Sequence, residues 1–255
     1  MRVLAAIRPV DAMLRTPVRT PLEVTGDRIR VIANRSGLYV IAEAPGTDAY
    51  TGRFALPVPP AAPQPPAVGS VQVTLSLVDP AGRYLPRTAV VQVPRDPDPA
   101  HRDQPGSLFM PIDVDLFPSP TMALREGWAT VRVSVKRANS QDGLPFAFVR
   151  VRRASDDVVL GRGVTDARGE AMVGIPGIPV TTWNPAPGAA VTATSVAARV
   201  AACFDKTAFH PETSTYPDPT ALEQAFATLP HSSDVDLDLT SGREVTRRID
   251  VTVPP

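Results

Sequence analysis

The sequence predicts an all-β protein with two β-sandwich domains of related origin and one short helix. Three observations lead to this fold class. The chain has 30 prolines in 255 residues, and a proline inside a helix costs about 3 kcal/mol because it removes a hydrogen bond and clashes with the preceding turn. Apolar residues recur every second position in several runs, and turn-forming clusters separate those runs. Short strands with regular turns are typical of a sandwich, of the immunoglobulin or transthyretin-like kind.

Four runs carry the strand prediction. In each run valine, leucine or isoleucine alternates with polar residues, which is the period of a strand with one face in water. The runs cover residues 71–77, 131–136, 149–152 and 248–253. Turn clusters between them include Gly26-Asp27, Gln141-Asp142-Gly143 and Ser241-Gly242.

The proline positions also suggest how the domains divide. Phe117-Pro118-Ser119-Pro120 lies midway along the chain and a new strand follows at Trp128. We therefore expect domains over residues 1–120 and 121–255, joined near residue 120. Two other proline-dense stretches, residues 57–66 and 94–105, predict extended surface arms, since proline cannot occupy a central strand.

One helix is predicted, over residues 218–229. Asp218 can cap its first turn, Pro219 suits the first helical position, and Pro230 ends it. Leu222, Ala225, Phe226 and Leu229 recur at helical spacing. The helix lies in an excursion over residues 203–233, which is long for a sandwich loop and therefore a place for specialised contacts.

The two halves of the chain share a hairpin pattern. Residues 28–41 and 160–173 each run from an apolar strand through Asn34 or Asp166, then reach Gly37 or Gly169 three residues later and return as an apolar strand. The Asn or Asp side chain can close a turn on its own backbone, and the glycine can take a positive φ. The pattern predicts the same hairpin twice.

The second copy resembles a known family. Gly143-Leu144-Pro145 opening a strand, followed by Thr165-Asp166-Ala167-Arg168-Gly169, is similar to the carboxypeptidase regulatory-like modules of the transthyretin-like sandwich class. This resemblance implies a scaffold fold with no catalytic residues to carry over. The chain as a whole is more weakly similar to accessory subunits of bacterial phage-tail-like contractile injection particles, which implies a structural role.

Charge and motif content exclude several classes of function. The 26 basic and 26 acidic residues balance, whereas phosphate binding needs a basic excess, so no nucleic-acid partner is expected. The sequence contains no metal-binding motif, no motif of a catalytic nucleophile and no phosphate-binding loop. We therefore expect no catalytic residues, no metal and no cofactor. Cys203 is the only cysteine. With no signal peptide or membrane span evident, the expected location is the cytoplasm, where a particle could assemble.

A few side chains remain as candidates. Asp234, Asp236 and Asp238 alternate on one strand face, which reads as a solvated face that discourages edge pairing, or as a cation site completed by neighbouring loops. Trp128 and Trp183 are expected in the core rather than on a sugar platform. His101, His210 and His231 fall in separate loops, and the trio His231, Ser232 and Asp234 is too close in sequence to form a triad.

Three functions from different classes follow. The first is a non-enzymatic structural or assembly subunit of a large bacterial complex, such as a contractile particle, with protein subunits or further copies of itself as partners. The second is a carbohydrate- or surface-binding module that uses Trp128, Trp183 or Tyr216 for stacking. The third is a hydrolase with a loop site around His210, Glu212 and His231.

Overall fold

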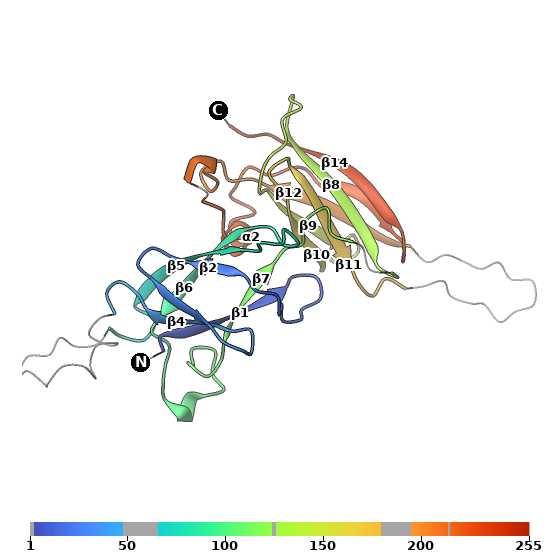
Figure 1. Cartoon of the computed structure of the whole chain (residues 1–255). Helices are drawn as coiled ribbons and strands as arrows, with labels where there is room; N and C mark the ends of the chain where they lie inside the picture. Colours follow the sequence, from blue (N-terminus) through green and yellow to red (C-terminus); the bar gives the residue numbers. More distant parts are fainter. Residues whose placement is uncertain (1–2, 48–65, 124–125, 180–194, 214, 255) are drawn as a thin grey trace, which may run out of the picture. The chain divides into compact units, whose positions relative to one another are not determined.

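The computed structural model describes residues 3–47, 66–123, 126–179, 195–213 and 215–254. Within these residues the chain forms strands, two short 3₁₀ turns and one short α-helix (Figure 1). The predicted all-β, sandwich-like fold with a lone helix is therefore confirmed. The chain forms two compact units: Met1–Ala81 with Pro86–Leu116, and Gly82–Leu85 with Phe117–Pro255. Among the described residues, no helix is long and apolar enough to cross a membrane.

The described residues of the first unit form seven strands in two sheets. Their order is β3-β4-β1-β7 in one sheet and β2-β5-β6 in the other. The strands are β1 (Ala5–Asp11), β2 (Glu23–Thr25), β3 (Arg30–Ala33), β4 (Tyr39–Glu43), β5 (Val71–Val78), β6 (Arg87–Val93) and β7 (Ile112–Leu116), with a 3₁₀ turn at Pro99–His101. The alternating run predicted at residues 71–77 is β5. The proline-rich stretch over residues 57–66 lies, apart from Pro66, outside the described residues.

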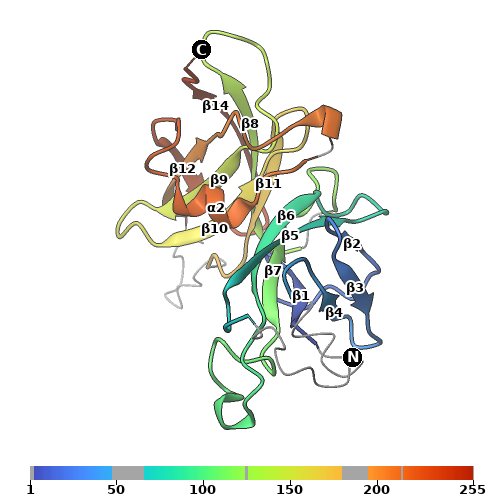
Figure 2. The same cartoon turned by 90° about the vertical axis from the view of Figure 1, so that its left-hand side faces the viewer.

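The described residues of the second unit also form seven strands in two sheets. Their order is β10-β9-β12-β13 and β11-β8-β14. The elements are β8 (Ala129–Arg137), β9 (Phe148–Arg153), β10 (Val159–Val164), β11 (Glu170–Ile175), β12 (Val196–Cys203), a 3₁₀ turn (Pro211–Thr213), α2 (Pro219–Gln224), β13 (Val235–Leu239) and β14 (Glu244–Val251). Figure 2 shows α2 beside β9 and β10 of this unit. β14 begins before the predicted run at residues 248–253 and ends two residues earlier.

The two units share most of their strand order. If the strands of each unit are numbered one to seven in chain order, strands four, one and seven are neighbours in one sheet of both units. Strands two, five and six are neighbours in the other sheet. In both units strands one and seven run parallel. Only the third strand differs: β3 pairs with β4, whereas β10 pairs with β9. This order is not that of an immunoglobulin constant domain, in which strand one neighbours strand two in a sheet with strands four and five.

The repeated hairpin is present in both units with the same hydrogen bonds. The Asn34 Oδ1 accepts the backbone N–H groups of Ser36 and Leu38 at 3.0 and 2.9 Å. The Asp166 Oδ1 accepts those of Arg168 and Glu170 at 2.8 and 3.0 Å. Glycine follows three positions later in both turns, with φ of 79° at Gly37 and 84° at Gly169. The predicted side-chain-closed turn is therefore confirmed twice.

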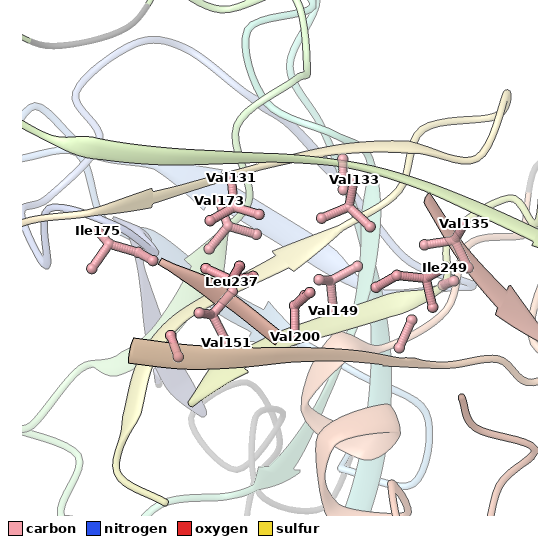
Figure 3. Close-up of a cluster of buried hydrophobic side chains, with 14 of the residues drawn as sticks. Val131, Val133, Val135, Val149, Val151, Val173, Ile175, Val200, Leu237 and Ile249 are labelled. Atoms are coloured by element: carbon pink, nitrogen blue, oxygen red, sulfur yellow. The ribbon is translucent and has the colours of Figure 1, made fainter. Parts of the chain in front are cut away.

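Alternate strand residues from both sheets make the core of the second unit. Figure 3 shows Val131, Val133 and Val135 of β8 facing Val149 and Val151 of β9 across the sandwich. All five are fully buried, which accounts for the period-two pattern in the sequence. Burial of such side chains stabilises the fold by about 1.5–3 kcal/mol each.

The α-helix α2 is shorter than predicted. It begins as expected, because the Asp218 side chain accepts the N–H of Thr220 at 2.9 Å and Pro219 occupies the first turn. It ends at Gln224 rather than Leu229. The Phe226 N–H bonds to the Glu223 carbonyl at 3.3 Å, a tighter three-residue step. The chain then continues in turns, and Phe226 is buried against the sheet.

Candidate functional site

The strongest candidate site is the connection between β6 and β7, here named the 94–111 loop. Arg95 organises it from within: its Nε donates to the Ser107 carbonyl at 3.2 Å, and its Nη2 donates to the carbonyls of Pro105 and Met110. Two backbone bonds join the sides of the loop: the Asp96 N–H donates to the Gly106 carbonyl, and the Leu108 N–H donates to the Asp96 carbonyl. A proline-rich arm expected to be merely extended is thus an internally bonded structure.

Asp96 fixes the short helical turn of the loop. Its Oδ1 accepts the Asp98 N–H at 3.0 Å, and its Oδ2 lies 2.7 Å from the His101 Nδ1. The Asp98 side chain in turn accepts the Ala100 N–H at 2.9 Å and caps Pro99–His101. The bond from the Asp98 amide and the contact with His101 lower the pKa of Asp96.

The loop presents two large apolar side chains to solvent. Phe109 is 55% exposed and Met110 is 44% exposed, next to the fully buried Ser107. The Ser107 hydroxyl accepts the Phe109 N–H at 3.2 Å, and its carbonyl accepts the Met110 N–H at 3.3 Å. The backbone that carries the apolar pair is therefore held in place, and both side chains remain accessible. This geometry suits binding to a protein partner, because a pre-ordered contact loses less entropy on association.

A pH titration should detect the contact that orders the loop. The hydrogen bond to the Asp96 carboxylate raises the pKa of His101 above its usual 6.5. The contribution of the His101–Asp96 pair to folding stability is fully present below the ordinary pKa of histidine. It is lost as the pH rises through the raised pKa of His101. On the acid side it is lost as the pH falls through the lowered pKa of Asp96. Proton NMR of the His101 ring should show the raised midpoint.

Asp96→Asn is the variant that tests this assignment. It should return the His101 midpoint toward the ordinary value, while Asp103→Asn in the same loop should leave it raised. Asp103 is paired with Arg102 rather than with His101. A wild-type His101 midpoint at the ordinary value would contradict the contact.

A second candidate lies in the second unit, where β8 and β14 begin side by side. A hollow of about 210 Å³, here named the Trp128 hollow, is lined by residues of both strand starts: Glu126, Gly127, Trp128, Thr130, Gly242, Arg243 and Glu244. Trp128 is half-buried and does not belong to the core cluster. Its expected place in the core is therefore wrong, because Trp128 directly precedes β8 at the end of the sheet and lines a surface hollow. Trp183 lies outside the described residues.

The excursion predicted over residues 203–233 folds back on its own unit. Phe226 packs edge-on to Phe148 of β9, with ring centroids 6.4 Å apart, and the Arg150 guanidinium lies 4.1 Å from the Phe226 centroid. The Glu223 carboxylate accepts a 2.7 Å bond from Arg162 of β10. Burial raises the pKa of the Cys203 thiol to about 12, so the thiolate is not available as a nucleophile near neutral pH.

Tyr216, a candidate stacking residue, lies in an aromatic cluster. Its ring lies 5.3 Å from that of Phe146 and 6.2 Å from that of Phe209, and the rings of Phe146 and Phe209 are 4.6 Å apart. The cluster ties the first part of the excursion to the segment before β9. Tyr216 is half-buried there.

The three aspartates share an exposed face, as predicted. They lie at or beside β13, an edge strand, where Asp236 and Asp238 pair in register with Arg199 and Ala197. Both carboxylate oxygens of Asp234 lie 2.8 Å from the Arg152 Nη2, and Asp236 lies 3.6 Å from the Arg199 Nε. Arg152 of β9 and Arg199 of β12 therefore each face one of the carboxylates. Among the described residues no group of three or more His, Cys, Asp or Glu side chains could hold a metal ion.

The histidines make separate local contacts. His101 bonds to Asp96, and the His210 Nδ1 lies 4.0 Å from Glu212. The His231 Nδ1 lies 2.8 Å from the Leu229 carbonyl. Ser232 is buried, where its hydroxyl accepts the Ala202 N–H, and Asp234 bonds to Arg152. The trio His231, Ser232 and Asp234 is thus engaged with three different partners.

Sequence reasoning missed Phe109 and Met110. An adjacent Phe-Met pair in an otherwise polar, proline-rich stretch was the available signal. Period-two analysis does not detect it, because the pair belongs to no strand.

No protein-family model matches the chain, and no curated protein matches it. Among solved structures, the Bacillus anthracis TIE protein is similar with a TM-score of 0.28 and 8% identity. The match covers 98% of this chain and 34% of that protein's chain, so this chain spans well under half of it. At this TM-score and identity the likeness assigns neither a family nor an activity to the chain.

Proposed function

We propose that the protein is a non-enzymatic assembly subunit that docks on another protein subunit through the 94–111 loop. The observation that carries this proposal is the exposure of Phe109 and Met110 on a backbone held by Arg95 and Ser107. Aromatic residues and methionine are enriched at the centres of protein interfaces, whereas charged residues are depleted there. An ordered loop with such a pair resembles an interface contact more than a linker.

The scaffold supports the same role. Two sandwiches with the same core strand order, joined in tandem, provide rigid supports for loops. The strand order of the second unit differs from that of an immunoglobulin constant domain and thus favours the transthyretin-like alternative. Together with the Asp166 hairpin, this supports membership of the second unit in the carboxypeptidase regulatory-like group. As the specific form, we propose an accessory subunit of a bacterial phage-tail-like contractile particle assembled in the cytoplasm.

The docking role is tested by making the apolar pair polar. In the native host, wild-type protein should sediment with a large particle, whereas the double variant Phe109→Ser, Met110→Ser should remain in the low-mass fraction. The expected loss of association is at least about tenfold, because interface aromatics often contribute 2 kcal/mol or more. Quantitative mass spectrometry of the sedimented fraction is the measurement.

Val158→Ser is the matched control. Val158 is 48% exposed but lies outside the 94–111 loop, so its substitution should leave association unchanged. Wild-type protein found only as a free monomer would refute the proposal, as would a double variant that sediments like the wild type.

A further inference from the structure

The Trp128 hollow has features of a ligand site that the docking role does not use. Its walls are fixed by hydrogen bonds between the two strand starts: Gly242 N–H donates to the Trp128 carbonyl at 3.1 Å, the Ser241 hydroxyl donates to the Gly127 carbonyl at 2.7 Å, and the Thr130 N–H donates to the Arg243 carbonyl at 3.0 Å. The hollow is therefore preformed rather than a gap between mobile loops.

Two lining glycines border open space. A Cβ at Gly127 or at Gly242 would have no atom within 4 Å other than those of the glycine itself and its two chain neighbours. Trp128, which follows Gly127 in the chain, is half-buried and lines the hollow. The hollow is therefore bordered by an accessible apolar side chain, which a stacking ligand requires.

The size of the hollow limits the ligand. Its volume of about 210 Å³ is below the roughly 300 Å³ at which pockets for drug-sized molecules begin. A single ring fits this space, and a dinucleotide or an extended cofactor does not.

The charges around the hollow favour a neutral ligand with many hydroxyl groups. Glu244 is paired with Arg132 at 2.9 Å, and the Arg132 Nη1 also bonds to the Pro120 carbonyl at 2.7 Å. The remaining lining charges are Glu126 and Arg243, both exposed. Among the described residues around the hollow, the two carboxylates (Glu126, Glu244) and the two guanidinium groups (Arg132, Arg243) sum to zero. Glu126 can accept hydrogen bonds and Arg243 can donate them.

We propose that the Trp128 hollow binds one neutral sugar ring, with its C–H face on the indole and its hydroxyls toward Glu126 and Arg243. A pyranose presents an apolar face, which matches Trp128, and a polar rim of hydroxyls, which matches Glu126 and Arg243. This site is separate from the 94–111 loop and does not depend on the docking role.

Tryptophan fluorescence tests the site directly. The chain has only two tryptophans, so in a Trp183→Phe background Trp128 is the sole reporter. Titration with the methyl glycosides of glucose, galactose, mannose and N-acetylglucosamine should give a saturable change with at least one, at a dissociation constant of about 1 mM. Glu126→Gln and Arg243→Gln in that background should each weaken binding at least about tenfold.

Two further variants make the result unambiguous. Trp128→Ala should abolish the saturation-transfer NMR signal of the bound glycoside, while Asp238→Asn, which removes an exposed carboxylate from β13, should preserve it. The Phe109→Ser, Met110→Ser variant should also bind the glycoside normally, so failure of docking and failure of sugar binding are distinguishable. No saturable signal with any glycoside, or an equal response in Trp128→Ala, would overturn the proposal.

Discussion

Gly169→Ala is expected to destabilise the second unit by about 2–5 kcal/mol. Gly169 has a φ of 84°, which costs an alanine roughly 1–2 kcal/mol. In addition, its Cβ would lie 2.7 Å from the Val135 carbonyl oxygen and 2.8 Å from the Gly143 Cα and the Leu144 amide nitrogen. All three are backbone atoms of the segments that pack on the turn, so the turn must move, at a further cost of about 1–3 kcal/mol.

Urea unfolding followed by tryptophan fluorescence measures this loss, because both tryptophans belong to the second unit. Gly177→Ala is the matched control: its φ is 75°, but no atom lies within 4 Å of the added Cβ. It should cost only the roughly 1–2 kcal/mol of the backbone conformation. Equal losses of unfolding free energy in Gly169→Ala and Gly177→Ala would contradict the close packing of backbone atoms around Gly169.

The second large effect is expected at Phe148, whose ring is fully buried. It lies edge-on to Phe117 at 6.2 Å and to Phe226 at 6.4 Å. Phe148→Ala should cost about 3–5 kcal/mol, because it removes a large side chain and leaves a cavity. It should also loosen the excursion over residues 203–233, since Phe226 would lose its support.

Urea unfolding gives the stability, and limited proteolysis gives the position of the loosening. New cleavage sites in Phe148→Ala should fall between Cys203 and Val235. Phe109→Ala, the same substitution at an exposed ring, should change stability by no more than about 0.5 kcal/mol. A Phe148→Ala protein with wild-type stability, or with cleavage only elsewhere, would refute the packing of α2 and Phe226 on β9.

Local pattern was sufficient for the strands and for the repeated hairpin. Apolar and polar residues alternate at residues 71–77 and 131–136 because one face of each strand is buried when the sheets pack. The alternation therefore predicts which side chains are buried. Asn34 and Asp166 make bonds to residues two and four positions away, so these contacts are encoded nearby in the sequence. The pairing of strands distant in sequence, such as β8 with β14, could not be read from either strand alone.

The candidate sites were less predictable for the same reason. The 94–111 loop is held by Arg95 through carbonyls ten to fifteen positions away, and a backbone carbonyl leaves no residue signature. The Trp128 hollow needs Gly242 and Arg243, more than a hundred positions along the chain. The predicted end of the helix, Leu229, is wrong because apolar residues continue at helical spacing beyond Gln224, where the helix ends and the chain continues in turns.

The third strand has a consequence for how the chain avoids misfolding. Tandem copies of one topology risk exchanging equivalent strands during folding. β3 belongs to the sheet of β4, whereas β10 belongs to the sheet of β9. The position that a third strand occupies in its own unit is therefore on the opposite sheet in the other unit, so we expect this difference to disfavour an exchange of third strands.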